Sequence, residues 1–174
     1  TLGNMVLYDG KLNFYRFFAS GSTFRYNDGI RANLVSTGGL YEIHYDDGRK
    51  ETFNSLNRLK SVADSAGNTL SMSYSGEYLT GVIDTLGRNI SYEYYDHNRL
   101  SKVTDFNGQY AEFVYLTGNT ASGSTYDLES INLSHGSGAM KTIRFEYSLG
   151  TDEDSAYNMT KLIDANGQTY VANT

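Results

Sequence analysis

Apolar residues occupy every second position in four segments of this chain. Residues 90–94 read Ile-Ser-Tyr-Glu-Tyr, and residues 70–74, 111–115 and 143–147 alternate in the same way. Alternation with a period of two, in segments rich in aromatic and β-branched residues, is typical of strands that bury one face. We therefore predict a strand in each segment. An aromatic residue ends each of these strands and an equivalent earlier one: Phe53, Tyr74, Tyr94, Tyr115 and Tyr147.

A second hydrophobic pattern follows each of these aromatic residues. It is a pair spaced three residues apart, and it occurs five times: Leu59/Val62, Leu79/Val82, Leu100/Val103, Leu128/Ile131 and Met159/Leu162. A flat strand would place the two members of such a pair on opposite faces, because its side chains alternate. We therefore predict a turn or a β-bulge near the first member of each pair.

Together the two patterns form a unit that repeats every 20 to 21 residues. Asp64, Asp84 and Asp105 follow this period, Asp164 closes a later copy, and each is followed three residues later by Gly. An Asp side chain accepts hydrogen bonds from nearby backbone N–H groups, and Gly takes a positive φ without steric cost, so we predict a chain reversal at each Asp. One such unit cannot bury its apolar face alone, which indicates an array.

The repeat is interrupted in its connections, which become longer near residues 117–126 and 148–158. Insertions collect in surface loops, so these two stretches are predicted to be enlarged loops. Leu133 takes the Asp position of the fourth unit, and we expect that unit to be the most irregular. The predicted organisation is irregular leading hairpins in residues 1–38, five repeats in 39–167, and the start of a further strand in 168–174. The chain is therefore expected to be a segment of a longer array.

The composition favours strands over helices. Hydrophobic residues make up 39% of the 174 residues, with 16 Tyr and 8 Phe, and no segment of ten or more residues has the apolar spacing of a helix. We predict an all-β fold with little or no helix, in which antiparallel β-hairpin repeats form one continuous curved sheet. No apolar run is long enough to cross a bilayer, so no membrane span is expected.

Charge and cysteine content exclude some classes of partner and site. The net charge is −6, whereas a surface that binds nucleic acid needs an excess of basic residues. The chain has no Cys, which excludes disulfides and thiolate metal sites but does not identify a compartment. We expect no nucleic-acid partner and no cofactor.

The repeated aspartates are candidates for acid and base catalysis. Glycosidases and aspartic proteases need two carboxyl groups close together, in environments that separate their pKa values. Four equivalent turn residues do not supply different environments, so we predict no catalytic residue. A hydrolase would require carboxylates from different units to converge in a cleft.

No metal site is predicted. His44, His97 and His135 are single and widely separated, unlike the closely spaced ligands of a zinc site. The cluster Asp152, Glu153 and Asp154 is the remaining candidate for Ca²⁺, but it lacks the spacing of a known calcium loop.

Tyrosines are the strongest candidates for ligand contact, because aromatic rings combine an apolar body with a polar tip. The periodic residues Tyr92, Tyr94, Tyr115 and Tyr147 fall on the face that we predict to be buried, which favours core packing. Three others lie off that face and are the candidate ligand contacts: Tyr95, Tyr110 and Tyr126.

The segment GRNISYEYYDHNRLSKVTDFNG, residues 87–108, resembles the YD repeats of the Rhs family, whose units look like G-R-x-x-x-Y-x-Y-D-x-x-G-R-L-x-x-V-T-D-x-x-G. The positions that match in order are Gly87, Arg88, Tyr92, Tyr94, Asp96, Arg99, Leu100, Val103, Thr104, Asp105 and Gly108. Tyr95 is inserted before the Asp, and His97-Asn98 replace the usual turn Gly. The resemblance covers residues 39–167. The predicted repeat signature is Tyr74, Asp84, Gly87, Tyr94, Leu100, Val103, Asp105 and Gly108.

The resemblance implies a long β-ribbon that winds into a hollow shell. In Rhs toxins the shell encloses a C-terminal toxin segment, and insecticidal toxin complexes and teneurins have comparable bodies. YD repeats have also been linked to carbohydrate binding. The family's self-cleaving members carry D-P-x-G-L motifs, and this chain has no Pro, so no catalytic residue is carried over.

Two functions follow as expectations. The first is a non-enzymatic segment of a YD-repeat shell that encloses or presents a toxin-like cargo, in a bacterial protein that is secreted or exposed at the cell surface. Its partners would be neighbouring repeats, further copies that associate through open sheet edges, or the cargo. The alternative is a carbohydrate-binding or adhesive module that uses exposed tyrosines and the enlarged loops.

Overall fold

The computed structural model describes residues 4–8, 13–20, 23–26, 31–120, 122–134, 138, 140–149 and 156–172. Two compact units divide the chain, residues 1–88 and 89–174. The first contains β1 (Met5–Tyr8), β2 (Phe14–Ser20), β3 (Thr23–Tyr26), β4 (Ala32–Thr37), β5 (Leu40–Tyr45), β6 (Lys50–Phe53), β7 (Leu59–Ala63), β8 (Thr69–Ser75) and β9 (Tyr78–Asp84).

The second unit begins with β10 (Asn89–Tyr94), the 3₁₀ turn η1 (Asp96–Asn98), β11 (Leu100–Thr104) and β12 (Tyr110–Tyr115). It continues with β13 (Leu128–Ser134), β14 (Met140–Leu149), β15 (Ala156–Ile163) and β16 (Thr169–Ala172). The described residues contain no α-helix. None of their helical segments is long and apolar enough to span a membrane.

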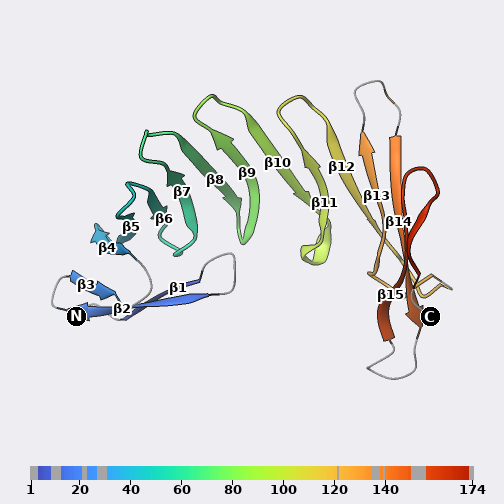
Figure 1. Cartoon of the computed structure of the whole chain (residues 1–174), viewed down its shortest axis with the longest axis horizontal. Coiled ribbons are helices and arrows are strands. Elements are labelled where there is room, and N and C mark those ends of the chain that lie inside the picture. The colour runs from blue at the N-terminus through green and yellow to red at the C-terminus, as the bar shows by residue number, and fades with distance from the viewer. Residues whose placement is uncertain are drawn as a thin grey trace. The chain divides into compact units, whose positions relative to one another are not determined.

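The strands form two sheets whose neighbours follow chain order. β1, β2 and β3 make a three-stranded sheet, and β4 to β16 make a 13-stranded sheet (Figure 1). Within each sheet, the described strand pairs are antiparallel. The predicted all-β array of antiparallel hairpins is confirmed in the 13-stranded sheet, and the leading strands β1 to β3 form a sheet of their own.

The predicted bulge is present in all five repeats, at the pair formed by the aromatic residue and the first member of the hydrophobic pair. The shifted pairs are Phe53 with Leu59, Tyr74 with Leu79, Tyr94 with Leu100, Tyr115 with Leu128 and Tyr147 with Met159. In the second repeat Tyr74 pairs with Leu79 but Ser73 pairs with Gly81, so Thr80 is the extra residue. The bulge therefore falls one residue after Leu79.

This bulge explains the three-residue spacing of the hydrophobic pairs. Leu79 lies opposite Tyr74, and Val82 lies opposite Met72. Tyr74 and Met72 are two apart and share a face, so Leu79 and Val82 also share that face. We call it the aromatic face; in the second unit it carries Tyr92, Val103, Phe113, Ile131, Phe145 and their ladder partners.

The opposite face, which we call the polar face, carries hydrophilic side chains. In β8 it presents Ser71 and Ser73. In the second unit it carries a cross-strand network in which the Asn132 side chain contacts Glu112 at 3.5 Å and accepts a hydrogen bond from Thr142 at 2.9 Å. The contrast between the two faces gives each strand its alternating sequence.

The fully buried core lies mainly in the first unit. Phe17 and Phe24, from the three-stranded sheet, form a cluster with Ala32, Leu34 and Ile43, from β4 and β5 of the large sheet. The aromatic face is therefore covered there by a second layer. Phe17 and Ile43 are the largest side chains with almost no exposed surface.

The prediction that the periodic tyrosines are buried needs correction. Tyr92, Tyr94, Tyr115 and Tyr147 are only half-buried. Strands of the second unit contact chiefly their ladder neighbours, and the described residues of that unit provide no second layer to cover the rings.

In the fourth repeat, the described part of the ladder after the bulge is regular, whereas the expected irregularity of its turn lies outside the described residues. β13 pairs with β14 without a register shift, from Ser130 with Arg144 to Ser134 with Met140. The strand ladder does not need an Asp at the Leu133 position, because its backbone hydrogen bonds are independent of the side chain. The turn after Ser134 lies largely outside the described residues.

Candidate functional site

The four periodic aspartates each hold a chain reversal. In every copy the Asp Oδ1 accepts hydrogen bonds from the N–H groups two and four residues later, at 2.8–2.9 Å. The Gly three residues later donates its N–H to the Asp carbonyl and has a φ between +80° and +88°. The residues concerned are Asp64 with Gly67, Asp84 with Gly87, Asp105 with Gly108 and Asp164 with Gly167. The predicted turn chemistry is confirmed.

These contacts occupy the carboxylates that a hydrolase would need. At Asp84, Oδ2 additionally accepts a hydrogen bond from Arg88 Nε at 2.7 Å, and this bond holds the pKa of the carboxyl below its ordinary value. The Asn68 side chain lowers the pKa of Asp64 in the same way, and the Gln168 backbone N–H lowers that of Asp164. Each shift favours a charged carboxylate, which suits a hydrogen-bond acceptor in a turn better than a proton donor.

A Tyr hydroxyl links consecutive repeats in the first unit. Tyr74 Oη donates to the carbonyl of Leu59 at 2.7 Å, so the aromatic residue of one repeat bonds to the bulge position of the preceding one. Arg58, just before Leu59, places its guanidinium 5.9 Å from the centre of the Tyr74 ring. The Tyr therefore contacts both residues of the Arg-Leu dipeptide.

The same arrangement recurs in the second unit. Tyr115 Oη donates to the carbonyl of Leu100 at 3.0 Å, and the Arg99 guanidinium lies 5.1 Å from the centre of the Tyr115 ring. Burial raises the pKa of the Tyr115 hydroxyl, which keeps it protonated as a donor. The repeat thus contains an Arg-Leu-Tyr staple: Arg and Leu from one repeat, and Tyr from the next.

Backbone hydrogen bonds hold the described residues of the enlarged connection between β12 and β13. Leu116 and Tyr126 close its base, because Leu116 N donates to Asp127 O and Tyr126 N donates to Leu116 O, both at 2.9 Å. Tyr147 N donates to Ser122 O at 2.8 Å and so ties the loop to β14. Leu116 is buried beneath the loop. The second enlarged connection lies mostly outside the described residues.

Two of the three predicted ligand tyrosines lie against this staple. The Tyr126 ring centre is 4.1 Å from the Arg99 guanidinium, and the Tyr95 ring meets the Tyr115 ring edge-on at 6.1 Å. Tyr95 and Tyr126 remain 45% and 57% exposed. Tyr126 also has φ +80°, a conformation uncommon outside Gly and one that is enriched at functional sites.

The third predicted residue, Tyr110, lies elsewhere. It pairs with Thr104 at the other end of the ladder, its ring centre is 4.2 Å from Lys102 Nζ, and its hydroxyl is 3.8 Å from Met140 Sδ. A role of Tyr110 in ligand contact stays a prediction. Any such site would be separate from the one beside Tyr95 and Tyr126.

Sequence reasoning did not assign a role to Arg58 or Arg99. The available signal was an Arg-Leu dipeptide sixteen residues before a periodic Tyr, which occurs at Arg58-Leu59 and Arg99-Leu100. Spacing alone does not show that a side chain reaches the next repeat, so the contact emerges only with the ladder register.

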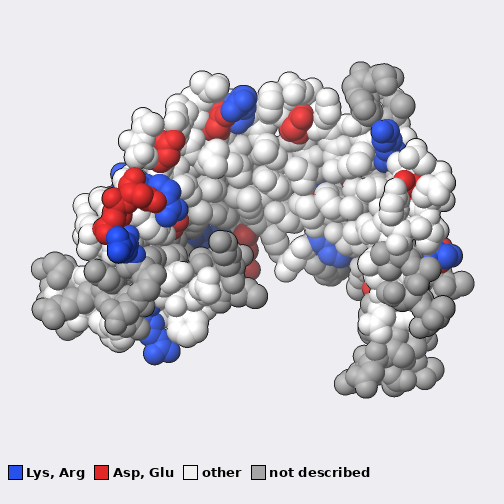
Figure 2. Space-filling view, viewed as in Figure 1, with Lys and Arg blue, Asp and Glu red and all other residues white. Residues whose placement is uncertain are grey.

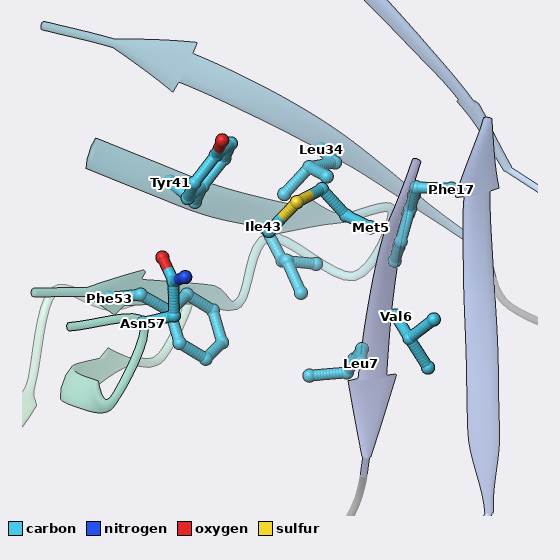
Figure 3. Close-up of a pocket in the computed structure, with 9 residues that line it drawn as sticks. All are labelled: Met5, Val6, Leu7, Phe17, Leu34, Tyr41, Ile43, Phe53 and Asn57. Atoms are coloured by element: carbon cyan, nitrogen blue, oxygen red, sulfur yellow. The ribbon is translucent and has the colours of Figure 1, made fainter. Parts of the chain in front are cut away.

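An apolar cavity lies between the two sheets of the first unit. It has a volume of about 60 Å³. Figure 3 shows the side chains around it, which come from β1, β2, β4, β5, β6 and the turn at Asn57: Met5, Val6, Leu7, Phe17, Leu34, Tyr41, Ile43, Phe53 and Asn57. Pockets for small molecules occupy roughly 300–1,000 Å³. The cavity is therefore a gap in the core packing rather than a ligand pocket.

Two shallow grooves follow the Asp turns, one in each unit. The first is about 300 Å³ and includes Val62, Leu70 and Asp84; the second is about 500 Å³ and includes Ile90, Val103 and Lys141. Each has an apolar floor from the aromatic face and a polar rim from a turn. The rim aspartates hold their own turns, so neither groove presents a free pair of carboxylates.

The parts of the chain that the structure describes contain no group of three or more His, Asp or Glu side chains that could hold a metal ion. His44 bonds to Glu42 at 2.8 Å, which also lowers the pKa of Glu42. The His97 side chain, His135 and the cluster Asp152–Asp154 lie outside the described residues.

Ionic pairs are local, such as Arg88 with Asp84 and Lys161 with Glu146, and Figure 2 shows basic and acidic side chains interspersed on the visible face.

No protein-family model matches this chain, and no curated protein matches it. Several solved structures are similar to this chain. The chain is similar to two crystal structures, of TcdB2-TccC3-TEV and TcdB2-TccC3-Cdc42, with TM-scores of 0.54 and 0.53 at 12% and 13% identity. Each alignment covers 92% of this chain and 10% of the other.

The third similar structure is the Photorhabdus luminescens Tc holotoxin pore carrying a TccC3 mutation. Its TM-score is 0.50 at 12% identity, over 98% of this chain and 10% of that one. This chain thus spans about a tenth of the length of the proteins that it resembles. The likeness establishes a shared fold: this chain has the β-sheet architecture of a segment of toxin-complex chains.

Proposed function

We propose that this chain is a non-enzymatic structural segment of a YD-repeat β-shell that encloses or presents a toxin-like cargo, in a bacterial protein that is secreted or displayed at the cell surface. The observation that carries the proposal is the repeated bulge. The same register shift occurs at every aromatic–aliphatic pair from Phe53 to Tyr147. A device that recurs once per hairpin builds an extended wall rather than one reaction centre.

The similarity to toxin-complex chains supports this proposal at the level of fold. The aspartates support it chemically, because their Oδ1 atoms are engaged by backbone N–H groups of their own turns. The local balance of basic and acidic side chains does not favour nucleic acid as a partner.

Limited proteolysis of the full-length gene product tests enclosure. In the intact protein, a segment beyond this chain should resist a protease that cleaves the same segment expressed alone. Mild denaturant should abolish the protection when the sheet unfolds, as followed by circular dichroism. Equal cleavage rates in the intact and isolated forms would contradict the shell function.

A second candidate is a carbohydrate-binding or adhesive module, favoured by the exposed Tyr95 and Tyr126 beside Arg99. A Tyr ring combines an apolar body with a polar hydroxyl, which suits contact with a ligand at the surface. A glycan array probed with this chain is the direct measurement, and binding should disappear in Tyr126→Ala but persist in Tyr170→Ala, a more exposed Tyr on β16. Absence of binding to any glycan would remove this candidate.

A further inference from the structure

Two arginines hold equivalent positions in different repeats, and they differ in what neutralises them. Arg58 and Arg99 each precede the bulge Leu, and each contacts the Tyr sixteen residues later, whose hydroxyl bonds to that Leu carbonyl. The two copies provide an internal comparison in which the repeat geometry is shared.

Arg58 is fully partnered by the short turn between β8 and β9. Its Nη1 donates to the Gly76 carbonyl, and its Nη2 lies 3.5 Å from a carboxylate oxygen of Glu77. The turn of the next repeat therefore supplies both an acceptor and a negative charge.

Arg99 lacks this partner. The corresponding connection is the enlarged loop 116–127, which brings the Tyr126 ring onto the guanidinium instead of a carboxylate. Within the described residues Arg99 makes no ion pair, and its buried Nε has no hydrogen-bond acceptor. The carboxylate of Asp127 is engaged elsewhere, because Oδ2 accepts a hydrogen bond from Ser124 N.

We propose that Arg99, Tyr126 and Tyr95 form a binding site for the carboxylate of an acidic peptide segment, which takes the place that Glu77 has at Arg58. Contacts with the Tyr115 and Tyr126 rings give the guanidinium N–H donors no oxygen acceptor, and a planar fork of such donors matches a carboxylate. The exposed rings of Tyr95 and Tyr126 supply apolar contact for the residue beside the acid.

Charge favours a single carboxylate over a polyanion. The chain carries a net charge of −6, and the site has Asp96 and Asp127 as sequence neighbours. The negative charge of the chain would repel a polymer with one negative charge per unit, because that repulsion acts over a Debye length of about 8 Å. A peptide with one Glu meets mainly the unpaired Arg99. The inference is separate from the shell function, and an acidic sugar at the same residues is an alternative outcome of the test.

The test uses the whole chain labelled with ¹⁵N-arginine and a capped peptide, acetyl-Ser-Gly-Glu-Tyr-Leu-amide, which copies residues 75–79. Titration should move the Nε–Hε signal of Arg99 and leave that of Arg58 unchanged. Replacing Glu by Gln in the peptide should weaken binding about 10-fold, since the charge-assisted bonds are lost.

Variants give a second measurement. Arg99→Lys keeps the cation but loses the fork, so the peptide should bind several-fold more weakly, whereas the matched variant Arg58→Lys should bind it as the native chain does. The comparison of the Glu and Gln peptides uses the native chain, so it tests the site even if a substitution in the protein disturbs the fold. Equal binding of the two peptides, or an unmoved Arg99 signal, would overturn the proposal. A response of Arg99 to glucuronate at lower concentrations than to the peptide would also overturn it in favour of an acidic sugar.

Discussion

At the residue scale, the periodic tyrosines Tyr74 and Tyr115 connect neighbouring repeats through their hydroxyl groups as well as through their rings. Each bulge interrupts the ladder near a Leu carbonyl, and buried carbonyls need donors. Tyr74 and Tyr115 provide them at Leu59 and Leu100 from the next repeat. This gives a physical reason for Tyr rather than Phe at these two positions.

Tyr115→Phe should therefore lower the free energy of unfolding by about 1 kcal/mol, the net value of one partly buried hydrogen bond. Urea denaturation followed by circular dichroism measures the change. Tyr92→Phe is the matched control, because Tyr92 lies on the same aromatic face and no hydroxyl bond holds it in the described structure. An equal loss of stability in both variants would show that the hydrogen bond from the Tyr115 hydroxyl to the Leu100 carbonyl does not stabilise the fold.

Gly123 is a second residue whose identity is required by its surroundings. It has φ +152°, and a Cβ placed there would lie 2.9 Å from both Leu116 Cδ1 and Asp127 Oδ2. Gly123→Ala should destabilise the loop by about 1–3 kcal/mol through backbone strain and overpacking.

Gly118, in the same loop, has open space around it: a Cβ added there would have no atom within 4 Å, and its φ is not strained, so Gly118→Ala should be nearly neutral. Hydrogen exchange at Tyr126 N–H and Tyr147 N–H, both bonded within or to the loop, reports the difference. Similar exchange rates in the two variants would mean that the packing around Gly123 is not needed.

At the element scale, the hairpin turns respond to pH. The Arg88 side chain holds the pKa of Asp84 below its ordinary value of 3.8. A depressed folded pKa means that the contribution to stability is present above about 3.8 and is lost as pH falls through the folded value. The hydrogen bonds of Asn68 and Gln168 act in the same direction on Asp64 and Asp164.

Asp84→Asn keeps an oxygen acceptor but removes the charge. The variant should have a lower urea midpoint than the native chain at pH 7, and the difference between the two midpoints should shrink as the pH falls and Asp84 becomes protonated. Asp96→Asn serves as the control, since Asp96 holds no Asp-Gly reversal. A constant difference between native and variant midpoints from pH 7 to pH 2 would contradict this account.

At the scale of the whole molecule, burial is unequal between the units. The five-residue buried cluster lies in the first unit, where the three-stranded sheet covers β4 and β5. Ile43→Ala should cost about 2–5 kcal/mol, the usual range for a fully buried aliphatic residue. Hydrogen exchange should rise in β4 to β6 and remain native in β13 and β14. A uniform increase across both units would show that they unfold together.

The open sheet also predicts self-association. β16 ends the strand order with a ladder partner on one side, β15, and unpaired strand edges recruit further strands. Light scattering coupled to gel filtration should detect oligomers at high concentration. Tyr170→Lys, at a 70% exposed edge position, should reduce them, and Leu56→Lys, in an exposed turn, should not. Monomers at every concentration would contradict edge pairing.

The sequence alone determined the repeat, the strands, the bulges and the Asp turns, because each depends on residues close together in the chain. Alternation identified the aromatic face, the three-residue spacing of Leu79 and Val82 required a bulge, and Asp84 with Gly87 indicated a reversal. These are local properties of side-chain direction and backbone conformation.

Only the tertiary structure decided what the faces and loops contact. Half-burial of Tyr92 and Tyr94 depends on whether a second layer covers the sheet, which the alternating pattern does not encode. The ring of Tyr126 reaches Arg99 across an inserted loop, whereas Glu77 reaches Arg58 across a short one, although both arginines stand in the same Arg-Leu dipeptide. Local sequence sets the direction of a side chain, but its partner is set by packing between residues that are distant in the chain.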